Sequence, residues 1–183
     1  MILNILLTNV IKPESVLLWT GFLLISLKMH LGFTNSTVNR FMNHHNGIEW
    51  RIKAGEQDVL ITAESKGLQL THCVAREIGH EYYAVARKTK KLYMQDGIEI
   101  TIESSITTGT EQKLYLSKHD VDLIKGKKVA IVDDVVSTGA SLKGLEALVE
   151  KAGGILHKKA FVLAEGDAAD RTDIIYLAKI PLL

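Results

Sequence analysis

Residues 129–141 read VAIVDDVVSTGAS, and this stretch decides the fold. A short β-branched run leads directly into the adjacent acids Asp133 and Asp134, and a loop of small residues follows before a helical pattern begins. A buried strand that passes through such a loop into a helix is typical of parallel α/β sheets, in which ligands bind beyond the carboxyl ends of the strands. The sequence therefore predicts a binding site at the end of this strand.

The small-residue loop has the chemistry of a phosphate site. A helix N-terminus leaves backbone N–H groups unpaired, and the helix dipole favours an anion there. Ser137, Thr138 and Ser141 add hydroxyl donors, and Gly139 allows a close backbone approach or a positive φ. The two acids suit sugar hydroxyls or a hydrated divalent cation. Neither a Walker A loop nor a G-x-G-x-x-G fingerprint occurs, so the site differs from both of those phosphate-binding motifs.

Apolar runs on either side of this stretch alternate between strand and helix patterns. Strands are expected at residues 58–63, 82–86, 98–102, 113–116, 128–132, 155–163 and 174–177, with helices at 68–78, 121–125 and 141–152. Short β-branched strands that alternate with helices predict an α/β fold with a Rossmann-like, mainly parallel sheet flanked by helices.

Composition excludes several classes of protein. The 183 residues are 46% hydrophobic and 23% charged, which is the balance of an ordinary globular domain rather than a disordered or coiled-coil chain. The formal charge of +1 gives no basic excess, so a nucleic-acid partner is not expected. With Cys73 as its single cysteine, the chain has no intrachain disulfide, and a cytoplasmic location fits.

The N-terminal segment differs from the rest of the chain. Residues 1–50 carry five charged side chains and include the apolar run VLLWTGFLLISL at 16–27. That run is shorter than the roughly 20 residues that a membrane-spanning helix needs. We interpret it as a buried helix, with membrane association or export as the minor alternative. The expected organisation is an atypical segment at 1–50 followed by one domain at 51–183.

Three motifs in order resemble the type I phosphoribosyltransferase family. The stretch at 129–141 is similar to the family's signature for phosphoribosyl pyrophosphate (PRPP). AESKG at 63–67 resembles its pyrophosphate loop, and ARK at 86–88 resembles an element of the adenine branch. The resemblance covers about residues 55–180 and implies the α/β fold above with a small hood and a mobile loop, the latter at 89–117. Residues 1–50 do not look like the family's hood.

The resemblance implies transfer of phosphoribose from PRPP to a purine base, with Mg²⁺ bound alongside PRPP. Adenine is the first expectation, and the activity would serve purine salvage. Xanthine, hypoxanthine or guanine, and orotate remain open as the base. A non-catalytic PRPP-binding regulatory module is the alternative from another class. The family habit is a homodimer in the cytoplasm, and no membrane partner is expected.

The resemblance also implies roles for individual residues. Asp133 and Asp134 would hold the ribose hydroxyls, and Glu103 matches the loop acid of adenine enzymes only in part, because the spacing is longer. The 5′-phosphate would be bound by Val136, Ser137, Thr138, Gly139, Ala140 and Ser141. The pyrophosphate would be bound by Glu64, Ser65, Lys66, Gly67, Arg87, Lys88 and Lys91. A non-proline cis peptide is expected at Ser65–Lys66, and no direct protein ligand is predicted for the metal.

Other polar residues lie outside these motifs. His44 and His45 are expected on a surface loop rather than at a metal. Residues 157–159 are expected at the exposed start of a strand. Residues 165–171 follow a strand end, where they could line the base or form a solvated loop.

Overall fold

The computed structural model of the protein describes residues 57–102 and 112–181. These residues all belong to the larger of two units, Ile48–Leu183. The predicted boundary at residue 50, the apolar run at 16–27, the histidine pair at 44–45 and Glu103 lie outside the described residues and stay predictions. Within the described ranges, no helix is long and apolar enough to span a membrane.

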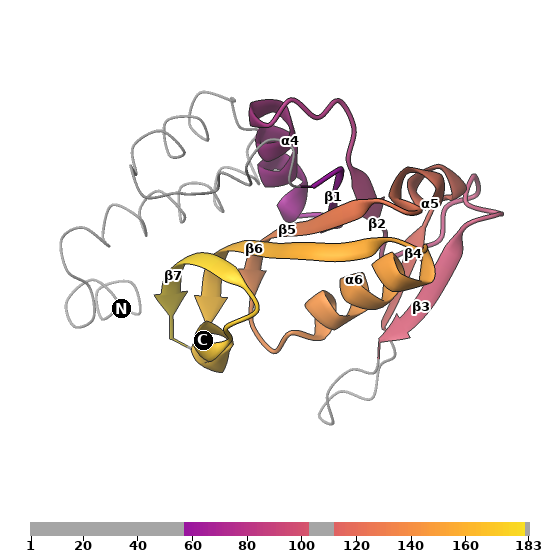
Figure 1. The fold of residues 1–183 in the computed structure, drawn as a ribbon. Helices are drawn as coiled ribbons and strands as arrows, with labels where there is room; N and C mark the ends of the chain where they lie inside the picture. Colours follow the sequence, from indigo (N-terminus) through magenta and orange to yellow (C-terminus); the bar gives the residue numbers. More distant parts are fainter. Residues whose placement is uncertain (1–56, 103–111, 182–183) are drawn as a thin grey trace. The chain divides into compact units, whose positions relative to one another are not determined.

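A five-stranded parallel sheet forms the centre of the described domain, in the strand order β2-β1-β5-β6-β7, and β3 and β4 form a separate antiparallel hairpin (Figure 1). The elements are β1 (Val59–Ala63), α4 (Gly67–Glu77), β2 (Ala84–Ala86), β3 (Ile98–Ile102), β4 (Gln112–Leu116), α5 (Lys118–Ile124), β5 (Lys128–Val136), α6 (Ala140–Lys151), β6 (Ile155–Glu165), the 3-10 helix η1 (Gly166–Asp170) and β7 (Ile175–Ile180). The predicted α/β fold with a mainly parallel sheet is confirmed.

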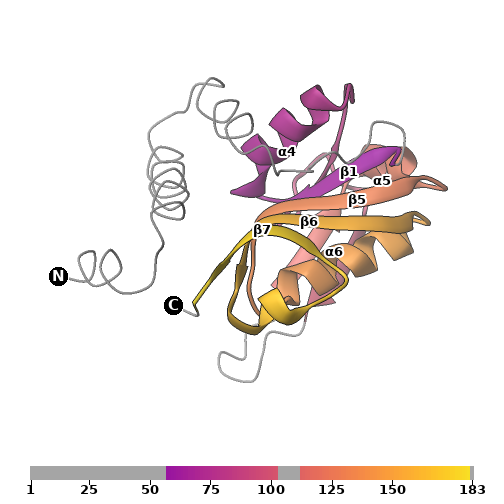
Figure 2. The same cartoon turned by 60° about the vertical axis from the view of Figure 1, so that its left-hand side comes forward.

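Helices cover both faces of this sheet. Helix α4 lies on one face and α6 on the other, as the two views together show (Figures 1 and 2). Val59 and Ile61 of β1 share a buried cluster with Leu145 and Leu148 of α6. Leu60, between them, is equally buried, because alternate strand residues point to opposite faces and both are covered. This explains why the central strands read as continuous apolar runs.

The β3–β4 hairpin is fastened to the domain at two places. It packs against α6 so closely that a Cβ atom at Gly144 would lie 2.4 Å from Cδ1 of Ile102. Its second strand forms an isolated antiparallel bridge to Arg87, just after β2, with Arg87 N to Tyr115 O at 2.8 Å and Tyr115 N to Arg87 O at 2.9 Å. The hairpin is thereby connected to the end of a sheet strand.

Several element bounds differ from the sequence prediction, and those of β5, α5 and β2 have a reason in the contacts. Strand β5 continues through both acids to Val136, because its ladder with β6 persists beyond the apolar run. Helix α5 begins at Lys118 rather than at residue 121, since Ser117 caps it by accepting from the Asp120 N–H at 3.1 Å. Strand β2 starts at Ala84 rather than at residue 82, because its ladder with β1 covers only three residue pairs.

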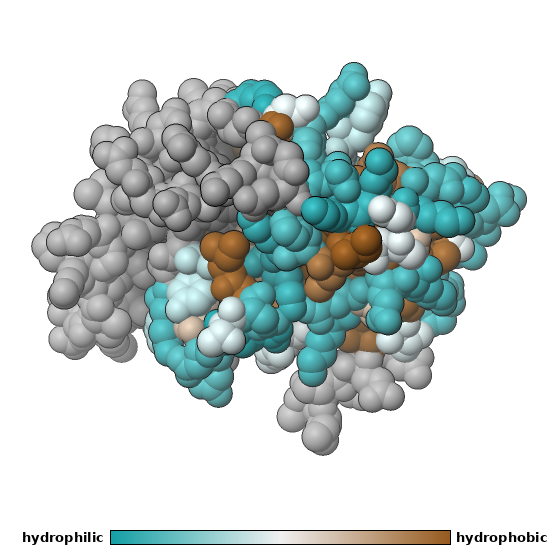
Figure 3. Space-filling model, in the orientation of Figure 1, coloured by the Kyte–Doolittle hydropathy of each residue, from teal (hydrophilic) through white to brown (hydrophobic). Residues whose placement is uncertain are grey.

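Most of the described surface seen in Figure 3 is hydrophilic, and its hydrophobic residues form small separate patches. Leu92 is 94% exposed, whereas Leu148 on α6 is 0% exposed. The same substitution at these two leucines therefore distinguishes the effect of core packing on stability from the effect of removing an exposed side chain.

We expect Leu148→Ala to lower the free energy of unfolding by about 2–5 kcal/mol, because it removes buried methyl groups and leaves a cavity. Leu92→Ala should change it by less than about 0.5 kcal/mol. Urea denaturation of both variants, followed by circular dichroism, tests this. An equal decrease in the free energy of unfolding in the two variants would show that α6 is not packed on the sheet as described.

Candidate active site

Parallel pairing brings two of the predicted binding stretches to the same edge of the sheet. Strands β1 and β5 are neighbours, with Ile61 opposite Ile131. Because the strands are parallel, both carboxyl ends lie at this edge. The loop after β1 starts at Glu64, and β5 carries Asp133 and Asp134 near its end. The pyrophosphate-loop motif and the two acids therefore meet.

Gly67 sets the contact between these two stretches. A Cβ atom at Gly67 would lie 2.3 Å from Oδ1 of Asp133 and 2.3 Å from Oγ1 of Thr62. The buried Thr71 hydroxyl donates to the Gly67 carbonyl at 2.9 Å and reaches the Val132 carbonyl at 3.3 Å. The first turn of α4 is thus fastened to β5, and only a residue without a side chain fits at its start.

Asp133 has an unusual protonation equilibrium for a carboxyl group. Its pKa is raised from 3.8 to about 7, chiefly by burial and next by the charge of Asp134, whereas a hydrogen bond from the Asp134 N–H to Oδ1, at 2.9 Å, and the charge of Lys88 act in the opposite direction. Lys88 follows β2, so its charge acts on an acid of β5 that lies two strands away in the sheet. The charge of Lys88 therefore stabilises the ionised form of Asp133.

Glu64 and Arg87 link the loop after β1 to the end of β2. Arg87 Nη1 donates to Glu64 Oε1 at 3.1 Å, and the Lys88 N–H donates to Oε2 at 3.4 Å. The Glu64 N–H also donates to the Ala86 carbonyl at 2.9 Å. The Glu64 carboxylate is negatively charged, and its ion pair with Arg87 orients the guanidinium group in this structure.

The cis peptide of this loop is at Glu64–Ser65, not at the predicted Ser65–Lys66. The reason is the start of α4. Lys66 already has helical angles, with φ −70° and ψ −37°, and the Ser65 carbonyl accepts from the Leu68 N–H at 3.4 Å. A helical turn requires trans peptides, so the irregular bond lies one position earlier.

The predicted phosphate loop encloses a cavity of about 120 Å³ at the start of α6. All six residues predicted to bind the 5′-phosphate line it, and Asp133 lines it too. Gly139 has φ +79°, a left-handed conformation that glycine adopts without strain. The Ala140 N–H donates to Oγ1 of Thr138 at 3.4 Å, which stabilises the turn. The cavity thus joins Asp133 to the small-residue loop.

One of the predicted binding residues takes no part in the interactions described above. Lys91 is exposed between β2 and β3, and its side chain makes no hydrogen bond or ion pair within 57–102 and 112–181. Glu103 is outside the described residues. Among the described side chains, no group of three or more His, Cys, Asp or Glu residues could hold a metal ion. Cys73 is buried on α4.

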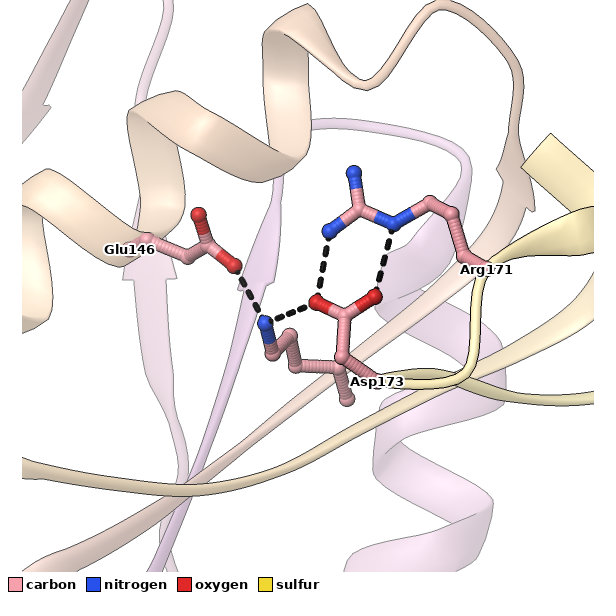
Figure 4. Close-up of polar contacts among 4 residues, drawn as sticks. Glu146, Arg171 and Asp173 are labelled. Carbon is pink, nitrogen blue, oxygen red and sulfur yellow. Dashed lines mark hydrogen bonds and ion pairs between the residues drawn. The ribbon is translucent and has the colours of Figure 1, made fainter. Parts of the chain in front are cut away.

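A charged network beside the phosphate loop was missed by the sequence analysis (Figure 4). Arg171 donates from Nε and Nη2 to the two carboxylate oxygens of Asp173, at 2.9 and 2.7 Å. Lys159 donates to Asp173 at 2.5 Å and to Glu146 of α6 at 2.7 Å. The Arg171 hydrogen bonds, followed by those of Lys159, hold the pKa of Asp173 well below its usual value.

The prediction that Lys159 is exposed at the start of a strand is wrong, because its side chain is only 16% exposed between two carboxylates. The partners come from α6, β6 and the segment before β7, and nothing local in the sequence signals that they meet.

Comparison with known proteins identifies close relatives. Residues 38–173 match the phosphoribosyl transferase domain family. Adenine phosphoribosyltransferase of Clostridium beijerinckii is 32% identical over 149 residues, covering 78% of each chain. Xanthine phosphoribosyltransferase of Exiguobacterium is 30% identical over 147 residues, covering 76% of this chain and 75% of the relative. The adenine phosphoribosyltransferase structure from Thermoanaerobacter pseudethanolicus has a TM-score of 0.57 at 28% identity, covering 69% and 73% of the two chains.

The raised pKa of Asp133 predicts how Asp133→Asn changes stability with pH. Because the folded protein binds this proton more tightly than the unfolded chain, the wild-type loses stability as pH rises from about 4 to about 7. Asparagine carries no such proton, so the variant should gain stability relative to the wild-type across that range, with the largest gap above pH 7. Urea denaturation at a series of pH values measures the gap. If the difference in stability between the variant and the wild-type did not change with pH, the raised pKa of Asp133 would be wrong.

Proposed function

The chain belongs to the phosphoribosyl transferase domain family, and from this premise we propose that it transfers phosphoribose from PRPP to a purine base, with adenine as the first candidate. One observation carries the proposal. The loop that begins at Glu64, the Asp133 carboxylate and the small-residue loop at 137–141 converge at one edge of the sheet. They offer partners for the three parts of PRPP, namely the pyrophosphate, the ribose and the 5′-phosphate.

The proposed reaction breaks the bond between the anomeric carbon of ribose and a pyrophosphate oxygen. The bonding electrons leave with pyrophosphate, and a ring nitrogen of the base forms the new bond to carbon and loses its proton. Positive charge develops on the ribose, close to Asp133 and Asp134, while negative charge grows on the leaving group near Arg87 and Lys88. Catalysis would consist of positioning and electrostatic stabilisation, and no nucleophilic side chain is needed.

Mg²⁺ is part of the proposal as a partner of PRPP. Pyrophosphate oxygens and water are its preferred ligands, and one or two carboxylates commonly complete such a site. Asp133 and Asp134 are the acids at the converging loops that fit this donor chemistry. The metal would neutralise charge on the leaving group, while Arg87 and Lys88 add positive charge from the protein side.

The relatives support purines as the class of base, but they do not single out one purine. They include adenine and xanthine phosphoribosyltransferases at similar identity. In the family the hood over the base is built from N-terminal residues; residues 1–50, which are either an unusual hood or a divergent N-terminus, lie outside the described residues. Adenine remains the first candidate because the ARK element at 86–88 resembles the adenine branch. A cytoplasmic homodimer is proposed on the same resemblance.

A panel of bases tests the function. The purified chain is incubated with PRPP, Mg²⁺ and one of adenine, hypoxanthine, guanine, xanthine or orotate, and the nucleotide formed is measured. We expect turnover with adenine. Turnover with another purine alone would correct the base, and saturable PRPP binding without turnover would favour a regulatory module. Neither binding nor turnover would contradict the proposal.

The site assignment predicts different losses for different substitutions. Asp133→Asn combined with Asp134→Asn should abolish PRPP binding and turnover, because the ribose loses both acceptors. Arg87→Ala should weaken pyrophosphate binding by roughly tenfold or more, which is the scale of one charge-assisted hydrogen bond. Lys118→Gln on α5 is the matched control, since Lys118 forms an exposed ion pair with Asp122. Full activity in the double variant would refute the assignment.

A further inference from the structure

The phosphate loop has no positively charged side chain of its own. Residues 137–141 read STGAS, and the two residues Asp133 and Asp134 close to it are acids. A phosphate monoester carries a charge of about −1.5 to −2 at neutral pH. If the proposed function is correct, backbone N–H groups and the helix dipole would have to stabilise this charge beside a carboxylate. A cation from another part of the chain would complete the site.

Arg171 lies in the position to supply it. A Cβ atom at Gly139, in the middle of the loop, would meet Nη1 of Arg171 at 3.3 Å, and apart from Gly139 and its two chain neighbours no other described atom lies within 4 Å of that point. Arg171 follows η1 and is far from the loop in sequence. The guanidinium group therefore faces the backbone of the loop, and Gly139 leaves the space between them open.

The orientation of this guanidinium group is fixed from its other side. Asp173 accepts from Nε and Nη2, and Asp173 is itself held by Lys159, which binds Glu146 of α6 (Figure 4). Nη1 makes no hydrogen bond to any acceptor in the described part of the chain. The network is anchored on α6, the helix that follows the loop, and it holds the Nη1 donor of Arg171 toward the loop.

We propose that Arg171 binds the 5′-phosphate of the substrate through Nη1, as a cationic partner that the loop motif does not contain. This inference rests on the proposed function. The network pairs two cations, Arg171 and Lys159, with two carboxylates, Asp173 and Glu146, so it holds Arg171 in place without excess negative charge beside the loop. Arginine suits this role because its planar fork can bind a carboxylate on one edge and a phosphate on the other.

Calorimetric titration with two separate ligands tests the proposal. Ribose 5-phosphate contains the 5′-phosphate, and magnesium pyrophosphate contains only the leaving group. Arg171→Gln should raise the Kd for ribose 5-phosphate about tenfold, equivalent to about 1.4 kcal/mol, and leave the Kd for magnesium pyrophosphate unchanged. Arg171→Lys should give an intermediate loss, because it keeps the charge but not the fork. Lys118→Gln, which removes one positive charge from α5, should change neither.

Two results would overturn the proposal. Unchanged affinity of Arg171→Gln for ribose 5-phosphate would show that Nη1 does not reach the phosphate. Equal losses for both ligands would show a general structural role. If Arg171→Gln fails to fold, the same two comparisons are made with Arg171→Lys. Failure of the wild-type chain to bind ribose 5-phosphate would instead overturn the proposed function, and this inference with it.

Discussion

The close approach of the Gly67 backbone to the Asp133 carboxylate is the constraint on which the rest of the site depends. It allows α4 to start directly beside β5, where Thr71 bonds the Val132 carbonyl. It also helps to bury Asp133, and burial is the main reason that the pKa of this acid is raised. A side chain at residue 67 would separate the loop after β1 from the acid and would open the site.

Polar groups from distant segments meet at this edge because the sheet is parallel and β5 pairs with β1, although β2, β3 and β4 separate the two strands in sequence. Strand β5 lies between β1 and β6, so its acids have the loop after β1 on one side. The hairpin is connected to the same region by the bridge between Arg87 and Tyr115. Arg87 is therefore held by Glu64 through its side chain and by β4 through its backbone, which gives a positioned charge on a rigid scaffold.

The parts of the structure that sequence predicts well are those set by local patterns. The apolar runs locate β1 and β3, and the loop at 137–141 is recognised from small residues between a strand and a helix. The cis bond was placed one position late because the first turn of α4 extends back to Lys66. The network of Arg171 and Lys159 could not be predicted, since its partners are brought together only by tertiary packing.

The most direct measurement is a crystal structure of the protein with PRPP and Mg²⁺. We expect pyrophosphate at the loop between Glu64 and Gly67, ribose hydroxyls at Asp133 and Asp134, and the 5′-phosphate in the cavity at 137–141. PRPP bound elsewhere on the domain, or bound with its two phosphate ends exchanged, would refute this site even if the protein proved to be an active transferase.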